Sequence, residues 1–222
     1  MDGKMPHLIM AIGSRGGYEA FANILQYVDP DVCGQGFMYL AEHVTGPNIR
    51  ENKEFEKAER IGFRLTKAED GMKLEPGKCY HQPCVYENAR QPILILGNGG
   101  NDGELCFRRT EPANRRFGGL SLSLHDALFG TGYANDPKRL MIAALSGCGA
   151  DGHEVIEEIA AMMESGGDIP LIAIQDPQTA KFYGIPESMK EESERLSVPH
   201  RVLEPDEIGH AITMFFGSPR HG

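Results

Sequence analysis

Several features that mark membrane and secreted proteins are missing from the sequence. The longest apolar runs, such as residues 8–12 and 92–96, are far shorter than the ~20 residues of a membrane span, and the N-terminus lacks a signal-peptide core. The five cysteines are an odd number without regular spacing, which favours reduced thiols. Cys79, His81 and Cys84 offer too few ligands for a metal site. We therefore expect a cytoplasmic protein with no membrane insertion and no metal.

Positive charge is also scarce. The chain has 22 Lys and Arg against 32 Asp and Glu, a formal net charge of −10. This balance argues against non-specific binding to nucleic acid or anionic membranes, so the expected partner is a small molecule or a protein. The acidity is uneven, because residues 1–150 hold 17 basic and 18 acidic side chains, whereas residues 151–222 hold 5 and 14. The nearly neutral N-terminal part does not exclude an acidic partner.

The composition is otherwise that of an ordinary globular domain. Of the 222 residues, 41% are hydrophobic and 24% are charged, which is enough for a packed core. No low-complexity linker or internal repeat divides the chain. We expect a single domain over residues 1–222.

Short apolar runs alternate with helical patterns along most of the chain. Strand–helix–strand units of this length predict parallel neighbouring strands. Residues 93–96 and 104–107 flank the loop GNGGNDG and predict an antiparallel hairpin. The predicted fold class is α/β, with a doubly wound, mostly parallel sheet and one antiparallel β-hairpin in a Rossmann-like three-layer sandwich. The main expected strands are 7–12, 36–41, 140–145, 169–174 and 199–203, and the expected helices are 18–27, 52–60, 121–130, 153–164 and 205–216, with one more after residue 177.

Three polar side chains follow predicted strands, at the edge where open α/β sheets carry their active sites. Ser14 lies in a glycine-rich turn at residues 13–17, where backbone N–H groups and a substrate carbonyl can approach its hydroxyl. His43 follows the second strand, in the place of a general base. Asp151 follows a later strand, where a carboxylate can orient an imidazole. Together these residues predict nucleophilic catalysis by a Ser-His-Asp triad.

Each of the three also has a simpler interpretation. Ser14 and Asp151 precede predicted helices, where serine and aspartate are common caps, and a lone histidine such as His43 is most often a hydrogen-bonded loop residue. The glycine-rich turn is also typical of phosphate-binding loops, but it lacks G-x-G-x-x-G and G-K-[ST]. Ile12 excludes a G-x-S-x-G elbow.

Five segments carry a more specific signal because they occur in a fixed order. They are residues 12–20 (IGSRGGYEA), 42–44 (EHV), 69–77 (EDGMKLEPG), 145–152 (LSGCGADG) and 174–186 (IQDP through GIP). In this order they resemble segments of the catalytic domain of the CheB family, the chemotaxis protein-glutamate methylesterases. The first resembles the turn with the family's nucleophilic serine, the second the segment with its histidine, and the fourth the loop with its aspartate.

The resemblance implies hydrolysis of methyl-esterified glutamates on a methyl-accepting chemotaxis receptor, often joined in the family by deamidation of glutamine, without a metal or organic cofactor. It makes Ser14 the nucleophile, His43 the proton shuttle and Asp151 the residue that orients His43. Backbone N–H groups would hold the oxyanion. The residues expected to bind the oxyanion or the substrate are Arg15, Gly16 and Cys148.

The chain departs from the family pattern at a few positions. Arg15 stands where a small residue or threonine is usual, Cys148 replaces a usual methionine, and Glu42 a usual glutamine. Residues 121–126 (SLSLHD) match only loosely. A cation beside the nucleophile can attract an acidic substrate surface or help an oxyanion. The family's receiver domain is not expected within residues 1–222, so regulation of that kind would come from another chain.

Other functions stay open at this point. A binding module could keep the fold but use the crevice around Arg15 to dock a signalling partner or an anionic metabolite. A hydrolase with the same chemistry could act on a different ester or on an amide. Cys148 as the nucleophile is a further alternative, although a cysteine in such a loop more often just fills the place of a small residue.

Overall fold

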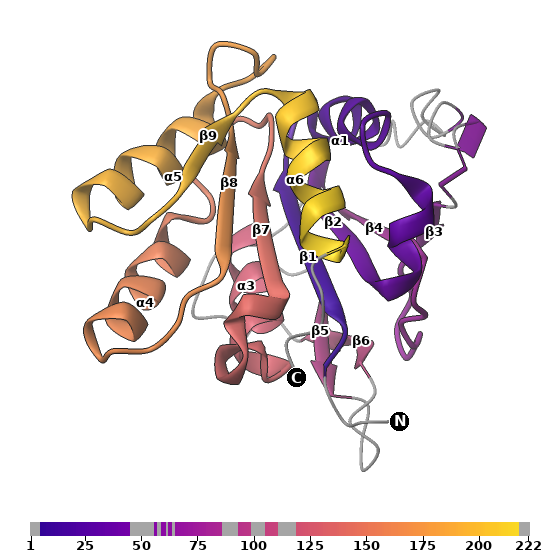
Figure 1. Ribbon diagram of the computed structural model, residues 1–222, viewed down its shortest axis with the longest axis horizontal. Helices are drawn as coiled ribbons and strands as arrows, with labels where there is room; N and C mark the ends of the chain where they lie inside the picture. Colours follow the sequence, from indigo (N-terminus) through magenta and orange to yellow (C-terminus); the bar gives the residue numbers. More distant parts are fainter. Residues whose placement is uncertain are drawn as a thin grey trace.

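The main element of the fold is a sheet of seven parallel strands in the order β3-β4-β2-β1-β7-β8-β9 (Figure 1). The computed structural model describes residues 5–44, 56, 59–60, 62–63, 65–85, 93–98, 105–110 and 119–217. The strands of this sheet are β1 (His7–Gly13), β2 (Gly36–Val44), β3 (Leu65–Lys67), β4 (Cys79–Val85), β7 (Leu140–Ala144), β8 (Leu171–Gln175) and β9 (Arg201–Leu203). β1 is therefore the central strand.

Helices cover both faces of this sheet, so the fold has three layers and the predicted α/β class is confirmed (Figure 1). One face carries α1 (Gly17–Leu25) and α6 (Pro205–Gly217), and the other carries α3 (Gly119–His125), α4 (His153–Glu164) and α5 (Gly184–Arg195). The shorter helical turns are η1 (Pro30–Gln35), η3 (Asp126–Gly130, a π-helical turn), η4 (Tyr133–Asn135) and η5 (Pro137–Arg139).

The central strand is apolar on both sides because both faces of the sheet are covered. Leu8, Met10 and Ile12 pack against the α3–α4–α5 layer, whereas the alternate residues Ile9 and Ala11 pack against α1 and α6. All five side chains are fully buried. Continuous apolar runs of this kind are typical of parallel strands covered on both faces, and alternation comes from the two-residue period of a strand.

The order of the strands reverses direction at β1. The chain passes from β1 through α1 to β2 on one side, and β7 pairs with β1 on the other side. Such a reversal leaves a crevice beyond the C-terminal ends of the two central strands, where open α/β proteins bind their ligands. Here it brings the turn at residues 13–17 next to the loop at residues 145–152.

The antiparallel pair does not belong to the main sheet, which contains no antiparallel hairpin. β5 (Ile93–Asn98) and β6 (Leu105–Thr110) form a second sheet of two strands. The pair packs on one face of the main sheet, because Leu96, Leu105 and Phe107 are buried in the α3–α4–α5 core. Backbone hydrogen bonds also tie Phe107 to Gly71 and Met72. Burial against this face, rather than strand pairing, sets the position of the hairpin.

Local patterns predicted several elements closely. The expected helix at residues 153–164 coincides with α4, and β1 and β7 begin where they were expected. The expected helix at 121–130 is divided into α3 and the π-helical turn η3. The expected helix at 52–60 lies mostly outside the described residues, of which 56, 59 and 60 are helical.

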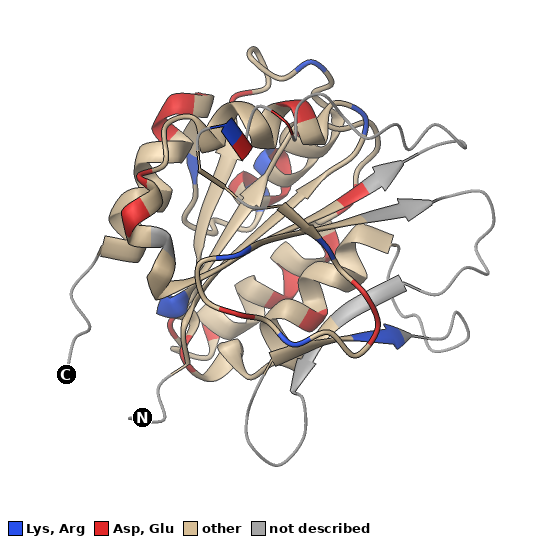
Figure 2. Cartoon of the chain, turned by 90° about the vertical axis from the view of Figure 1, so that its right-hand side faces the viewer, with Lys and Arg blue, Asp and Glu red and all other residues tan. Residues whose placement is uncertain are grey.

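Acidic residues are spread over the helices, with fewer lysines and arginines among them (Figure 2). Most of the 14 acidic residues of the C-terminal third lie in α4, α5 and α6. Among the described residues, no helix has both the length and the apolar character that crossing a bilayer requires.

Candidate active site

The turn after β1 is tight because glycine is required at two of its positions. A Cβ on Gly13 would lie 2.9 Å from the Gly17 Cα, so the chain folds back on itself closely. Gly16 has φ +87°, a left-handed conformation that glycine adopts without strain. Gly16 is the N-cap of α1, and no side chain caps the helix from that position. Ser14 is therefore not the N-cap of α1, and its hydroxyl is available for another role.

The Ser14 hydroxyl is held by the backbone of the facing loop. Its Oγ accepts a hydrogen bond from the Cys148 N–H at 2.6 Å and donates one to the Cys148 C=O at 3.0 Å. The Ser14 N–H also donates to the Ser146 C=O at 3.1 Å. Ser14 is only 5% exposed. The two loops predicted to meet at this edge of the sheet therefore interlock around one hydroxyl.

The closeness of the two loops depends on Gly147. A Cβ at this position would lie 2.7 Å from the Ser14 nitrogen, 2.8 Å from the Ser14 Oγ and 2.5 Å from the Ile185 Cδ1. Real Cβ atoms do not approach other atoms so closely, so any side chain here must displace the turn of Ser14.

Ser146 joins the same loop to β8 and to the segment before α5. Its N–H donates to the Gln175 Oε1 at 2.9 Å, and Gln175 is buried. Its Oγ accepts from the Phe182 N–H at 3.0 Å, and the Phe182 C=O accepts from the Gly147 N–H at 2.8 Å. The loop that faces Ser14 is thus fixed at each residue from 146 to 148.

Asp151 lies farther along this loop, between two glycines with left-handed backbones. Gly149 has φ +101° and Gly152 has φ +100°, and Gly152 is the N-cap of α4. Asp151 is therefore not the N-cap of α4, which removes its simpler interpretation. Its side chain is partly exposed at the same edge of the sheet as Ser14.

The backbone of His43 lies near the C-terminal end of β2, beside Cys84 of β4. Its neighbour Glu42 pairs with Gly13, the last residue of β1. The backbone of His43 therefore lies one residue beyond the end of β1. The side chain of His43 lies outside the described part of the structure. The hydrogen-bond chain from Ser14 through His43 to Asp151 therefore stays a prediction.

Glu42 lies on β2, and its buried carboxyl group reaches the N-terminus of α1. Its Oε1 accepts from the Tyr18 N–H at 3.2 Å, and its Oε2 has no hydrogen-bond partner among the described residues. Burial raises the pKa of Glu42 from its ordinary value of 4.5 to about 8, although hydrogen bonds from the Tyr18 and Gly17 amides lower it in part. At pH 7 Glu42 is therefore mostly a neutral acid.

A Tyr–His pair that the sequence did not single out lies beside Glu42. The Tyr18 hydroxyl is 3.1 Å from the His81 Nδ1, and the two rings meet edge to face. Burial, with a smaller contribution from the Lys67 charge, lowers the pKa of His81 to about 4. His81 is thus neutral at pH 7. No cluster of metal-binding side chains is found in the described ranges.

Arg15 lies exposed beside Ser14. Its guanidinium carbon is 5.0 Å from the centre of the Phe182 ring, a cation–π contact. No ion pair to Arg15 is found in the part of the chain that the structure describes. Next to it, a cavity of about 310 Å³ opens between α1 and the segment after β8, and its lining includes Gly16, Ser146 and Gln175.

Comparison with known proteins identifies the family of this chain. The family model described as CheB methylesterase matches residues 9–212. The chain belongs to the CheB methylesterase family. A solved structure, the CheB methylesterase catalytic domain of Thermotoga maritima, has a TM-score of 0.65 and 16% sequence identity to this chain, and the alignment covers 95% of this chain and 98% of that one. At this identity the likeness shows the shared CheB fold, while a comparison with curated protein sequences gives no match.

The close packing at Gly147 generates a prediction about stability. Gly147→Ala should lower the free energy of unfolding by about 2 kcal/mol, because the methyl group overpacks the contact with Ser14. The measurement is urea denaturation at pH 7. Gly34→Ala is the matched control, since a Cβ there meets nothing within 4 Å. Equal stabilities of the two variants would contradict the packing described above.

The buried acid generates a second prediction. Between roughly pH 4.5 and 8 the native protein keeps a proton on Glu42 that the unfolded chain releases, so stability falls as pH rises, by up to about 1.4 kcal/mol per unit. Glu42→Gln removes this dependence, so the variant should gain stability relative to the wild type from pH 5 to pH 8. Urea denaturation at both pH values measures the difference. Exposed Glu69→Gln is the control, and a Glu42→Gln variant that tracks it would show that Glu42 is charged at neutral pH.

Proposed function

We propose that the chain is a serine esterase that hydrolyses glutamate methyl esters on a chemoreceptor-type protein. The observation that carries the proposal is the contact between the Ser14 Oγ and the Cys148 N–H at 2.6 Å, at the switch point of a CheB-family sheet. A hydroxyl in this position has an oriented backbone donor beside it before any substrate arrives. Preorganised donors of this kind supply a large share of catalysis in acyl transfer.

In the proposed reaction the Ser14 Oγ attacks the ester carbonyl while His43 takes the hydroxyl proton and passes it to the departing methanol. Asp151 holds the imidazole in the required tautomer and stabilises its charged form. A water molecule, activated by His43, then hydrolyses the acyl-enzyme to release the glutamate carboxylate and restore the Ser14 hydroxyl. Attack on a glutamine side chain would follow the same steps with ammonia as the leaving group.

The oxyanion of this reaction would form next to Cys148. When the Ser14 Oγ bonds to carbon, the Cys148 N–H can turn from that oxygen to the new oxyanion, which lies one bond away. The Gly16 N–H is a second candidate donor, because no hydrogen bond from it is found among the described residues. The Ser14 proton, which points to the Cys148 C=O, must rotate toward His43 before attack.

Arg15 supports a substrate with a carboxylate near the ester. Its guanidinium is exposed and fixed over Phe182, while the Phe182 backbone holds Ser146 and Gly147. A planar, permanently charged group suits a carboxylate better than a flexible ammonium does. We propose that Arg15 docks an acidic side chain of the substrate beside the ester that Ser14 attacks.

A binding module is the second candidate function. It is favoured by the burial of Ser14 and by the two hydrogen bonds that tie its hydroxyl to Cys148, an arrangement that also suits a closed site. In that case the exposed Arg15 would bind an acidic partner without any reaction. Serine-directed fluorophosphonate probes separate the two functions, since only an activated Ser14 reacts with them.

The nucleophile is tested by Ser14→Ala, which should lower methanol release from a methylated receptor by roughly 10³-fold or more and abolish fluorophosphonate labelling. Cys148→Ala is the matched control, because it removes the thiol and keeps the backbone N–H. It should retain activity within about 5-fold. Labelling that survives in Ser14→Ala and disappears in Cys148→Ala would reverse the assignment of the nucleophile.

The substrate role of Arg15 is tested with two peptide methyl esters that differ in one neighbouring residue, glutamate or glutamine. Arg15→Ala should lower kcat/KM about 10-fold for the acidic peptide and leave the neutral one nearly unchanged, because only the first loses a charge-assisted contact. Arg201→Ala, an exposed arginine on β9, is the control. An equal loss on both peptides would assign Arg15 to the reaction itself instead of to docking.

A further inference from the structure

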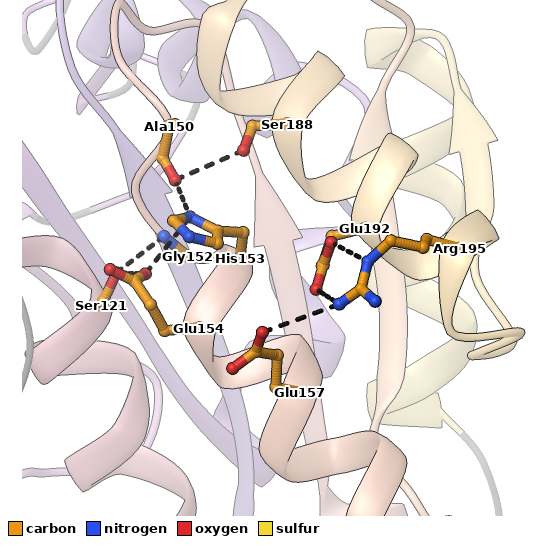
Figure 3. Close-up of polar contacts among 9 residues, drawn as sticks. All are labelled: Ser121, Ala150, Gly152, His153, Glu154, Glu157, Ser188, Glu192 and Arg195. Atoms are coloured by element: carbon orange, nitrogen blue, oxygen red, sulfur yellow. Dashed lines mark hydrogen bonds and ion pairs between the residues drawn. The ribbon is translucent and has the colours of Figure 1, made fainter.

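The peptide that follows Asp151 is held by a serine from another part of the chain. Ser121, on α3, is fully buried, and its Oγ accepts from the Gly152 N–H at 2.8 Å (Figure 3). The same Oγ donates to the Glu154 Oε2 at 2.5 Å. The hydroxyl therefore accepts a hydrogen bond from the loop of Asp151 and donates one to the first turn of α4.

The peptide that precedes Asp151 is fixed as well. The Ala150 C=O accepts from the His153 Nδ1 at 2.5 Å and from the Ser188 Oγ at 3.3 Å (Figure 3). The two donors come from α4 and α5. The peptide groups on both sides of Asp151 are thus held by hydrogen bonds.

The loop has little room to move between these anchors. A Cβ on Gly152 would lie 2.7 Å from the Met189 Sδ and 2.8 Å from the Ile12 Cδ1, so α5 and β1 enclose the backbone. By contrast, the ion pair of Arg195 with Glu157, which also links α5 to α4, is exposed and holds these helices only weakly (Figure 3). The buried hydroxyl is the firmer contact.

Comparison with Ser123 shows that the contact of Ser121 is specific. Ser123 lies on the same helix and is fully buried too, but its Oγ donates to the Gly119 C=O at 3.3 Å, inside its own helix. This is the usual local hydrogen bond of a serine in a helix. Ser121 instead reaches a backbone group 31 residues away.

We propose that Ser121 is a positioning residue for Asp151. It holds the peptide after Asp151 so that the carboxylate meets the His43 imidazole in the orientation that proton transfer needs. Ser121 makes and breaks no bond in the reaction. The inference rests on the proposed function, because it assigns Asp151 the orienting role in the triad.

The test compares Ser121→Ala with Ser123→Ala in the full chain. Each removes one buried hydroxyl from α3, but only the first leaves Gly152 without its acceptor. Ser121→Ala should lower kcat on a methylated receptor roughly 10- to 100-fold, with KM changing less than about 3-fold, while Ser123→Ala leaves both nearly unchanged. Ser121→Thr, which keeps the hydroxyl, should restore most of the rate.

A second readout does not depend on turnover. The pKa of the His43 imidazole, followed by NMR, should fall in Asp151→Asn because a neutral side chain no longer stabilises the imidazolium. Ser121→Ala should move this pKa in the same direction, and Ser123→Ala should not. If Ser121→Ala does not fold, Ser121→Cys, which keeps the size but is a poor acceptor, takes its place.

The outcomes separate this inference from the proposed function. A wild type that releases no methanol, but in which Asp151→Asn and Ser121→Ala both lower the pKa of His43, would overturn the esterase and support the positioning role. An active wild type in which Ser121→Ala behaves as Ser123→Ala overturns the positioning role alone. If Asp151→Asn leaves the pKa of His43 unchanged, Asp151 does not orient His43 and the inference falls with it.

Discussion

The interlock between the Ser14 hydroxyl and the backbone of Cys148 is the constraint on which the rest of the site depends. It requires two loops from adjacent parallel strands to approach within hydrogen-bond distance, and Gly147 allows this because it has no side chain. The strand order produces the approach, since the sheet reverses direction at β1 and leaves the ends of β1 and β7 side by side. The strand order alone thus places the two loops of the candidate site next to each other.

The buried acid explains how a departure from the family pattern at Glu42 leaves the turn of Ser14 intact. The first amides of α1 need acceptors, and Gly16 at the N-cap has no side chain to provide one. Glu42 supplies its Oε1 from the neighbouring strand. With a pKa of about 8, it does so as a neutral acid, which combines a carbonyl acceptor with an O–H donor, much as the glutamine usual in the family combines a carbonyl acceptor with an NH₂ donor. The substitution changes the charge only above neutral pH.

The sequence predicted what depends on local pattern and on strand order. α4 and β1 follow from apolar periodicity, and the meeting of the Ser14 and Asp151 loops follows from their position after parallel strands. What it did not predict is set by contacts distant in sequence. The hairpin of β5 and β6 packs by burial on a face that no local pattern identifies, and the hydrogen bond of Ser121 to Gly152 spans 31 residues. The segment around Ser121 matches the family pattern only loosely, so the motif did not point to this contact.

Substrate docking and oxyanion binding would share one piece of backbone in this protein. Phe182 supports the Arg15 guanidinium with its ring, while its N–H and C=O bind Ser146 and Gly147, the residues directly before Cys148. A carboxylate bound by Arg15 would therefore press on the same segment that orients the Cys148 N–H. Because Gly147, which binds the Phe182 C=O, packs closely against Ser14, a shift at Phe182 would act on a residue in direct contact with Ser14. In the proposed function, the recognition of an acidic substrate and the orientation of the oxyanion donor would then be properties of the same loop.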